Sequence, residues 1–136
     1  MKLNLQMKHL LQLEEFAQFA VALAGLYFFG MHLPWWAWVP VFFAPDLGAL
    51  GYLINPAVGG MTYNLLHHKA IAIGVTAIGF YMQTDLVLTA GLILYAHSSF
   101  DRILGYGLKY PDNFKHTHLG WLGRGERGKP VNQLSS

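Results

Sequence analysis

Residues 86–105 read LVLTAGLILYAHSSFDRILG, an apolar stretch of helical length that carries His97 and Asp101 near its end. A helix needs about 20 residues to cross the hydrocarbon layer of a bilayer. Ionisable groups inside such a helix are costly, so they usually face the interior of a helix bundle and mark a functional site. The stretch therefore predicts a transmembrane helix that contributes two residues to a polar site.

Three further apolar stretches precede it, at about residues 10–31, 35–54 and 57–81. The connections between the four stretches are only a few residues long, and short connections place consecutive helices side by side and antiparallel. We therefore expect an all-α, polytopic membrane protein with a four-helix antiparallel transmembrane bundle in residues 1–122. The polar composition after residue 122 predicts a flexible tail over residues 123–136.

The composition supports this class. Hydrophobic residues make up 54% of the 136 residues and charged residues only 12%, whereas soluble domains carry about 25% charged residues. The basic residues cluster before the first stretch and after the fourth, which predicts that both termini, and thus the C-terminal segment, lie in the cytoplasm. They form no patch for nucleic acid. The chain has no cysteine, which excludes disulfides, zinc–thiolate sites and thiol nucleophiles.

The polar residues of the four stretches lie at one depth. At a rise of ~1.5 Å per residue, they fall roughly 6–15 Å inside the cytoplasmic ends of their helices. Residues three or four apart share a helix face. Asn64 and His67 therefore point to one side of their helix, and His97 and Asp101 to one side of theirs. The residues concerned are Glu14, Asp46, Asn64, His67, His97 and Asp101.

Such a group predicts a metal site in the cytoplasmic half of the bundle. Metal sites in bundle cores are built from carboxylates and histidines on facing helices. We expect His67, His97 and Asp101 to be the ligands, with Asp46 and Glu14 as catalytic carboxylates. Imidazole with carboxylate suits zinc, iron or manganese, and the pattern does not choose among these divalent metals.

Each residue also has a structural interpretation. Glu14 lies in the first turns of a helix, where the helix dipole favours a negative charge. Asp46 follows Pro45, which kinks the helix and frees a backbone carbonyl. His97 is compatible with a neutral core histidine, and Asp101 with an interfacial ion pair to Arg102. Lys69, near the middle of its stretch, needs a carboxylate partner that the sequence does not identify.

Several motifs carry a family resemblance. They are Ala44-Pro45-Asp46, Leu50-Gly51-Tyr52, Tyr63-Asn64 with His67, the run FDRILGYGLKY at residues 100–110, and Thr117-His118-Leu119-Gly120. Over residues 10–120 the chain resembles a small bacterial integral membrane family, domain of unknown function 4260. The resemblance implies a four-helix, multi-pass protein of the bacterial inner (cytoplasmic) membrane without an established activity. Positions that match the family pattern are Glu14, Asp46, Tyr52, Asn64, His67, His97, Asp101, Arg102, Lys109 and His118.

The order Pro45-Asp46, Asn64 with His67, and His97 with Asp101 is also similar to predicted inner-membrane metal-dependent hydrolases. That similarity implies metal-assisted hydrolysis. The chain lacks a second acid after Asp46, and it has Asn64 where a histidine would help. One metal ion is therefore expected rather than two.

Two functions follow from these patterns. The first is a single-metal hydrolase in the membrane, acting on a lipid or other amphiphilic substrate. The residues expected to bind that substrate or support the ligands are Tyr52, Asn64, Arg102, Lys109 and His118. The second is a non-enzymatic accessory subunit of a larger membrane complex, with a structural polar core or a cofactor contact. A membrane-protein partner or a homo-oligomer is compatible with both.

Overall fold

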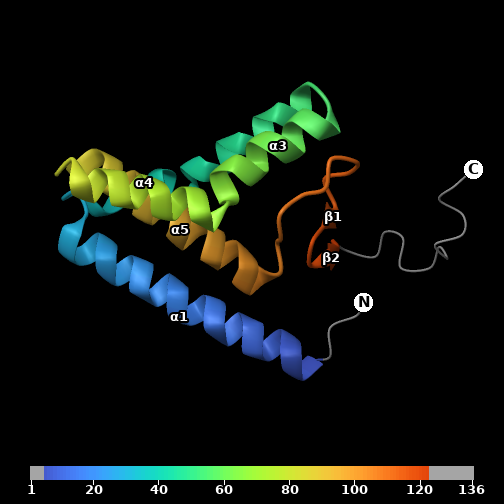
Figure 1. Cartoon of the computed structure of the whole chain (residues 1–136), viewed down its shortest axis with the longest axis horizontal. Coiled ribbons are helices and arrows are strands. Elements are labelled where there is room, and N and C mark those ends of the chain that lie inside the picture. The colour runs from blue at the N-terminus through green and yellow to red at the C-terminus, as the bar shows by residue number, and fades with distance from the viewer. Residues whose placement is uncertain (1–4, 123–136) are drawn as a thin grey trace, which may run out of the picture.

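The computed structural model describes residues 5–122 (Figure 1). Most of this part of the chain is helical, which confirms the all-α prediction. In chain order the elements are α1 (Leu5–Phe29), the 3₁₀ helix η1 (Trp35–Ala37), α2 (Trp38–Phe43), the 3₁₀ helix η2 (Ala44–Leu53), α3 (Pro56–His67), α4 (Lys69–Tyr81), α5 (Asp85–Leu104), β1 (His116–Thr117) and β2 (Gly120–Trp121). The predicted tail, residues 123–136, lies outside the described residues.

Helix α5 is the centre of the fold, with α4 packed on one side and α1 on another (Figure 1). Small residues allow the close approach of α4 and α5. A Cβ atom at Gly91 would collide with the backbone of Thr76, and one at Gly79 with the backbone of Leu88. Helices that pack this closely commonly carry glycine at the contact. The buried side of α5 therefore presents small and polar groups, including His97 and Asp101, to its neighbours.

The prediction of one continuous helix over residues 57–81 is wrong. Helix α3 ends at His67, His68 adopts an extended backbone (φ −89°, ψ 115°), and α4 begins at Lys69. The Nδ1 atom of His68 accepts a hydrogen bond from the amide of Ala70, and so caps the new helix. Because of this break, α3 turns away from α4 and packs against η2 (Figure 1).

The second predicted helix, residues 35–54, is also not a single α-helix. It consists of η1, the six-residue α2 and η2. Proline residues at positions 40 and 45 remove backbone donors that a continuous α-helix would use. The hydroxyl group of Thr62 in α3 donates to the carbonyl of Gly48, which fixes η2 against α3. The simple four-helix bundle is thus replaced by a three-helix unit, α1, α4 and α5, beside an η2–α3 hairpin.

The first and fourth predicted helices agree with α1 and α5. Helix α5 ends at Gly105, whose positive φ of 90° suits glycine and reverses the chain. The segment that follows returns towards α3 and forms the small β1–β2 hairpin, an element that the sequence did not predict. Lys109 and Thr117 form a further antiparallel bridge beside it.

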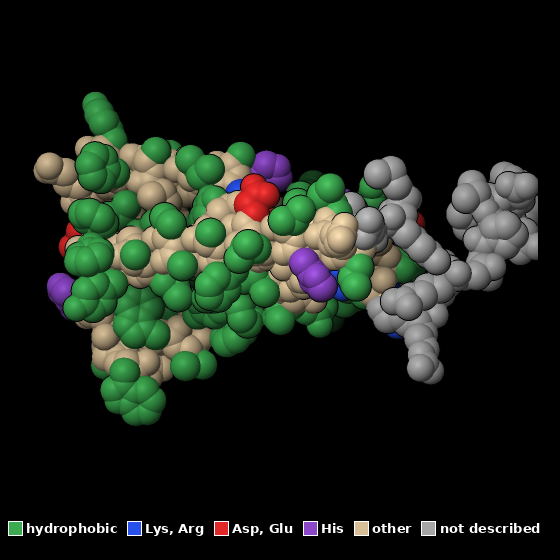
Figure 2. All heavy atoms as spheres, turned by 90° about the horizontal axis from the view of Figure 1, so that it is seen from below, with side chains coloured by type: hydrophobic (Ala, Val, Ile, Leu, Met, Phe, Trp, Pro, Cys, Tyr) green, Lys and Arg blue, Asp and Glu red, His purple; other side chains and the backbone are tan. Residues whose placement is uncertain are grey.

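Within residues 5–122, no helix combines the length and the apolar character needed to cross a membrane. The surface is nevertheless rich in large hydrophobic side chains. Figure 2 shows such side chains over much of the face that α1 contributes to, with few charged groups between them. Examples with more than two thirds of their area exposed are Val21, Tyr27, Phe28, Trp35, Leu53, Ile54, Phe80 and Tyr81.

Candidate metal centre

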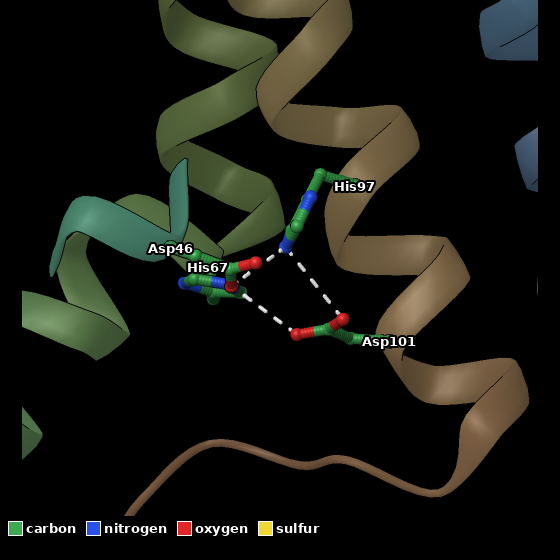
Figure 3. A group of neighbouring side chains, drawn as sticks. All are labelled: Asp46, His67, His97 and Asp101. Atoms are coloured by element: carbon green, nitrogen blue, oxygen red, sulfur yellow. Dashed lines mark hydrogen bonds and ion pairs between the residues drawn. The ribbon is translucent and has the colours of Figure 1, made fainter. Parts of the chain in front are cut away.

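Four of the predicted residues come together in one group. Asp46 comes from η2, His67 from the last turn of α3, and His97 and Asp101 from successive turns of α5 (Figure 3). One ligand atom from each residue lies within 4.8 Å of the others. We call this group the His/Asp cluster.

The break at His68 matters for this arrangement. His67 closes α3, and the chain then changes direction, so that α3 approaches α5 only near this end. Asp46 lies in the first turn of η2, directly after Pro45. Three chain segments therefore contribute to the His/Asp cluster, with only α5 supplying two residues.

The spacing inside the cluster is uniform. The Nε2 atom of His67 lies 3.5 Å from Oδ1 of Asp46 and 3.3 Å from Oδ2 of Asp101. The Nε2 atom of His97 lies 3.1 Å from Oδ1 of Asp46 and 3.6 Å from Oδ1 of Asp101. A tetrahedral ion with bonds of about 2.0–2.1 Å separates its ligand atoms by roughly 3.3 Å. The four distances are close to that separation, with His67 nearer Oδ2 and His97 nearer Oδ1 of Asp101, and the four candidate ligand atoms all lie within 4.8 Å of one another.

The hydrogen bonds made by the two Nδ1 atoms determine whether each Nε2 atom can donate or accept. Nδ1 of His67 donates to the carbonyl of Tyr63, and Nδ1 of His97 to the carbonyl of Phe42, each at 2.8 Å. A carbonyl oxygen only accepts, so in a neutral ring the proton is on Nδ1 and Nε2 carries a lone pair. Both lone pairs then face carboxylate oxygens, which are also acceptors. This arrangement requires a cation between them, either a proton or a metal ion.

Geometry favours the metal ion at His67. Its Nε2 atom is buried without a hydrogen-bond partner among the described residues. The distances from it to the two carboxylates exceed the usual 2.7–3.2 Å of an N–H···O hydrogen bond. Metal-bound histidines characteristically donate their other ring N–H to a backbone carbonyl or a carboxylate, which fixes the ring orientation. Both histidines of the cluster do so.

The cluster is closed on one side and open on the other. The side chains of His67 and His97 are at most 1% exposed and that of Asp101 is 12% exposed, whereas that of Asp46 is 50% exposed. Catalytic metal sites differ from structural ones in keeping an open position for water or substrate. Asp46 is the cluster residue on the open side.

The comparison with known proteins identifies the family. The pattern of the family described as Domain of unknown function (DUF4260) matches residues 8–122. The chain belongs to this family. No curated protein and no solved structure matches the chain. The description of the DUF4260 family gives no activity, so the function has to be inferred from the site itself.

Tyr63 and Arg102 hold the ligands in place. The Tyr63 hydroxyl donates to Oδ2 of Asp101 at 2.7 Å, and its ring stacks on His67 with centroids 3.7 Å apart. Arg102 donates to the carbonyl of His67 at 3.3 Å. In the sequence, Tyr63 appears only within a family motif and carries no predicted role. Its position four residues before His67, on the same helix face, is the signal that could have assigned it a role.

Asn64 and Lys109 connect the cluster to the C-terminal segment. The Asn64 side chain exchanges two hydrogen bonds with the backbone of Lys109, at 2.6 and 2.7 Å. Lys109 is only 5% exposed, and its ammonium group lies over the rings of Tyr63 and Phe114. Burial lowers the pKa of Lys109, although the Asp101 charge opposes that shift. Both residues therefore lie close to the cluster without being ligands.

Tyr52, in η2, and His118, in the C-terminal segment, lie further from the cluster. The Tyr52 ring packs edge-on against Phe114, and its buried hydroxyl has no hydrogen-bond partner among the described residues. Nδ1 of His118 accepts from the amide of Leu108, and burial lowers the pKa of this imidazole. Their contacts are with the C-terminal segment rather than with the four cluster residues.

The structure does not bring Glu14 into the cluster. Its side chain is exposed on α1, because adjacent residues of a helix point in different directions and Glu15 takes the inward position. Glu15 forms an ion pair with Lys69, whose ammonium group also donates to Gln18. Gln18 in turn accepts from the hydroxyl of Tyr95. This network supplies the carboxylate partner that Lys69 was expected to need.

Proposed function

We propose that the protein is a single-metal hydrolase that acts at a membrane on a lipid or another amphiphilic substrate. One observation carries the metal-dependent part of this proposal. Two buried imidazoles, each fixed by an Nδ1 hydrogen bond to a carbonyl, direct their Nε2 atoms towards two carboxylates. The donor set of two nitrogens and two carboxylates suits zinc, iron or manganese.

The open side of the cluster supports hydrolysis. A metal ion in such a site lowers the pKa of bound water and provides a nucleophile near neutral pH. His67, His97 and Asp101 are the buried ligands in this proposal. Asp46, exposed and 3.1 Å from His97, is placed to bind the ion from the open side or to accept a proton from the water. Of the two carboxylates expected to be catalytic, Asp46 is the one that lies in the cluster, whereas Glu14 is exposed on α1.

The membrane part of the proposal is supported by the exposed hydrophobic side chains. Monomeric soluble proteins rarely present large continuous apolar patches. The polar residues of α1 are also partly withdrawn from the surface, since Glu15 and Gln18 pair inside with Lys69 and Tyr95. We propose an embedded protein of the bacterial inner membrane, with both termini in the cytoplasm, as the distribution of basic residues indicates.

A second candidate is the accessory subunit of a membrane complex or a homo-oligomer. The aromatic side chains of Tyr27, Phe28, Trp35 and Trp36, all more than half exposed, favour it because they form an apolar end available to a partner chain. A stable stoichiometric partner after mild solubilisation, together with protein that is well folded but free of metal, would support this candidate over the enzyme.

Metal analysis of the purified protein tests the enzyme directly. We expect about one divalent ion per chain in the wild type and a strong loss in His97→Ala, because removing a ligand costs most of the affinity of such a site. His9→Ala, at an exposed position of α1, is the matched control and should keep its metal. Folded wild-type protein that binds no divalent metal would refute the proposal.

A further inference from the structure

A cavity of about 460 Å³ lies between α1, α2 and α5, next to the His/Asp cluster. Small-molecule sites occupy roughly 300–1,000 Å³. Every residue that lines it is apolar or aromatic, and none is charged. We propose, on the basis of the proposed function, that this cavity holds the hydrocarbon chain of the substrate while the polar end of the substrate lies at the metal.

The cavity and the cluster share one face of α5. Ile93 lines the cavity, His97 follows one turn later, and Asp101 one turn after that. Residues four apart on a helix lie above one another. A ligand that extends along this face of α5 would therefore pass from the cavity wall directly to the cluster.

The end of α2 also connects the cavity with the His/Asp cluster. Phe42 and Phe43 line the cavity, and their rings lie 5.3 and 6.1 Å from the ring of His97. The carbonyl of Phe42 accepts the Nδ1 hydrogen bond of His97. Asp46 follows one turn after Phe43, so the exposed carboxylate lies beyond the aromatic rings at this end of the cavity.

The shape of the cavity suits an extended chain. From Phe19, whose ring lies 6.2 Å from that of Phe42, the lining continues along α1 to Tyr27. Eight helical residues correspond to about 12 Å at ~1.5 Å per residue. Leu26 and Ile93 form a buried floor, while Val39 and Phe43 are exposed at 60% and 48% and form an opening to the apolar surface.

A second groove, on the other side of α5, provides the comparison. It is larger, about 740 Å³, and lies between α1, α4 and α5, where Leu88, Leu92 and Tyr95 contribute from α5. None of its lining residues belongs to the cluster or touches it through a ring contact. A lipid that merely coats the protein should occupy both hollows, whereas a substrate chain should select the first.

Photo-crosslinking distinguishes these cases. The probe is a fatty acid with a diazirine near its methyl end, added to the full chain in phosphatidylcholine nanodiscs. With the labelled positions assigned residue by residue from fragment spectra, we expect labelling to concentrate on Leu23, Leu26 and Ile93 rather than on Leu88 and Leu92 of the second groove. Val39→Trp fills the opening and should reduce this labelling by about tenfold, or ~1.4 kcal/mol of binding. Val21→Trp, at another exposed valine that lines the second groove, should leave it unchanged.

The outcomes separate this inference from the proposed function. Equal labelling of both hollows, or labelling that Val39→Trp does not reduce, would overturn the inference even if the protein binds metal. Selective labelling of the first cavity that persists in His97→Ala, in a protein whose wild type binds metal, supports it. If the wild type binds no metal, the proposed function fails and the substrate assignment fails with it, whatever the labelling pattern.

Discussion

Tyr63 donates a 2.7 Å hydrogen bond to Oδ2 of Asp101, the carboxylate oxygen that lies 3.3 Å from Nε2 of His67. The bond links α3 to α5 at the point where both helices contribute to the cluster. Because one lone pair of Oδ2 is used in this way, the orientation of the carboxylate is fixed before any metal binds. Groups of this kind behind metal ligands typically affect metal affinity strongly.

Replacing Tyr63 with phenylalanine tests that relationship. Tyr63→Phe keeps the ring that stacks on His67 but removes the hydroxyl group, so we expect about 10- to 100-fold weaker metal binding with the fold preserved. Competition with a chelator of known affinity gives the dissociation constant. Tyr81→Phe, at a position that is 89% exposed, is the control and should bind as the wild type does. Equal affinity in the two variants would show that the Tyr63 hydroxyl does not orient the ligand.

The ion pair between Lys69 and Glu15 should stabilise the fold by linking α1 to the first residue of α4. Both side chains are about one fifth exposed, so removing one partner leaves a partly desolvated charge. We expect Lys69→Met to lower the free energy of unfolding by about 1–3 kcal/mol, after allowance for solvent screening. Denaturant unfolding of the detergent-purified protein measures the change.

The double variant Glu15→Gln/Lys69→Met provides the matched comparison. Since it leaves no unpaired charge, we expect it to be more stable than Lys69→Met alone, and the double-mutant cycle gives the coupling between the two residues. Strictly additive effects would show that the two side chains do not interact.

The close packing of α4 against α5 predicts opposite effects at two glycines. Gly91→Ala places a methyl group against the backbone of Thr76, so we expect a loss of roughly 1–3 kcal/mol of stability. Gly74→Ala lies in open space within α4, where alanine is favoured over glycine by about 0.8–1.0 kcal/mol. Unfolding midpoints should therefore move in opposite directions, and a gain in both variants would contradict the packing described.

The hairpin at the C-terminal end of the described chain should respond to acid. His116 stacks between Tyr110 and Trp121, and its Nδ1 atom donates to Asp112, which lowers the pKa of that carboxyl group. A carboxyl with a depressed folded-state pKa stabilises the fold above its unfolded pKa of about 3.9. This contribution to stability is lost as the pH falls through the lower pKa that the carboxyl group has in the folded state.

An NMR titration of the Asp112 carboxyl carbon follows this pair directly. The midpoint should lie below the ordinary aspartate range in the wild type and return towards it in His116→Gln. An unchanged midpoint in the variant would mean that His116 is not the cause of the shift.

Part of the site was predictable because helix geometry is local. The spacing of His97 and Asp101, and the depth of Asp46 and His67 in their apolar stretches, required only the rise per residue of a helix. The structure brings these four residues together even though two of the four predicted helices are not continuous.

The remaining features depend on contacts between distant parts of the chain. At the break, His68 caps α4 through one hydrogen bond and Arg102 donates to the carbonyl of His67, while no proline or glycine marks the position in the sequence. Which of Glu14 and Glu15 faces inward depends on where Lys69 and Gln18 lie. The hairpin, in which His116 pairs with Trp121 and Thr117 with Gly120, likewise has no clear pattern in the sequence.

X-ray absorption spectroscopy of the zinc-loaded protein tests the central claim most directly, because it reports the atoms around the ion. We expect two imidazole nitrogens and carboxylate oxygen at about 2.0–2.1 Å, with one imidazole lost in His67→Ala and one in His97→Ala. A spectrum without histidine ligands, or one that neither variant changes, would contradict a metal centre built from the His/Asp cluster.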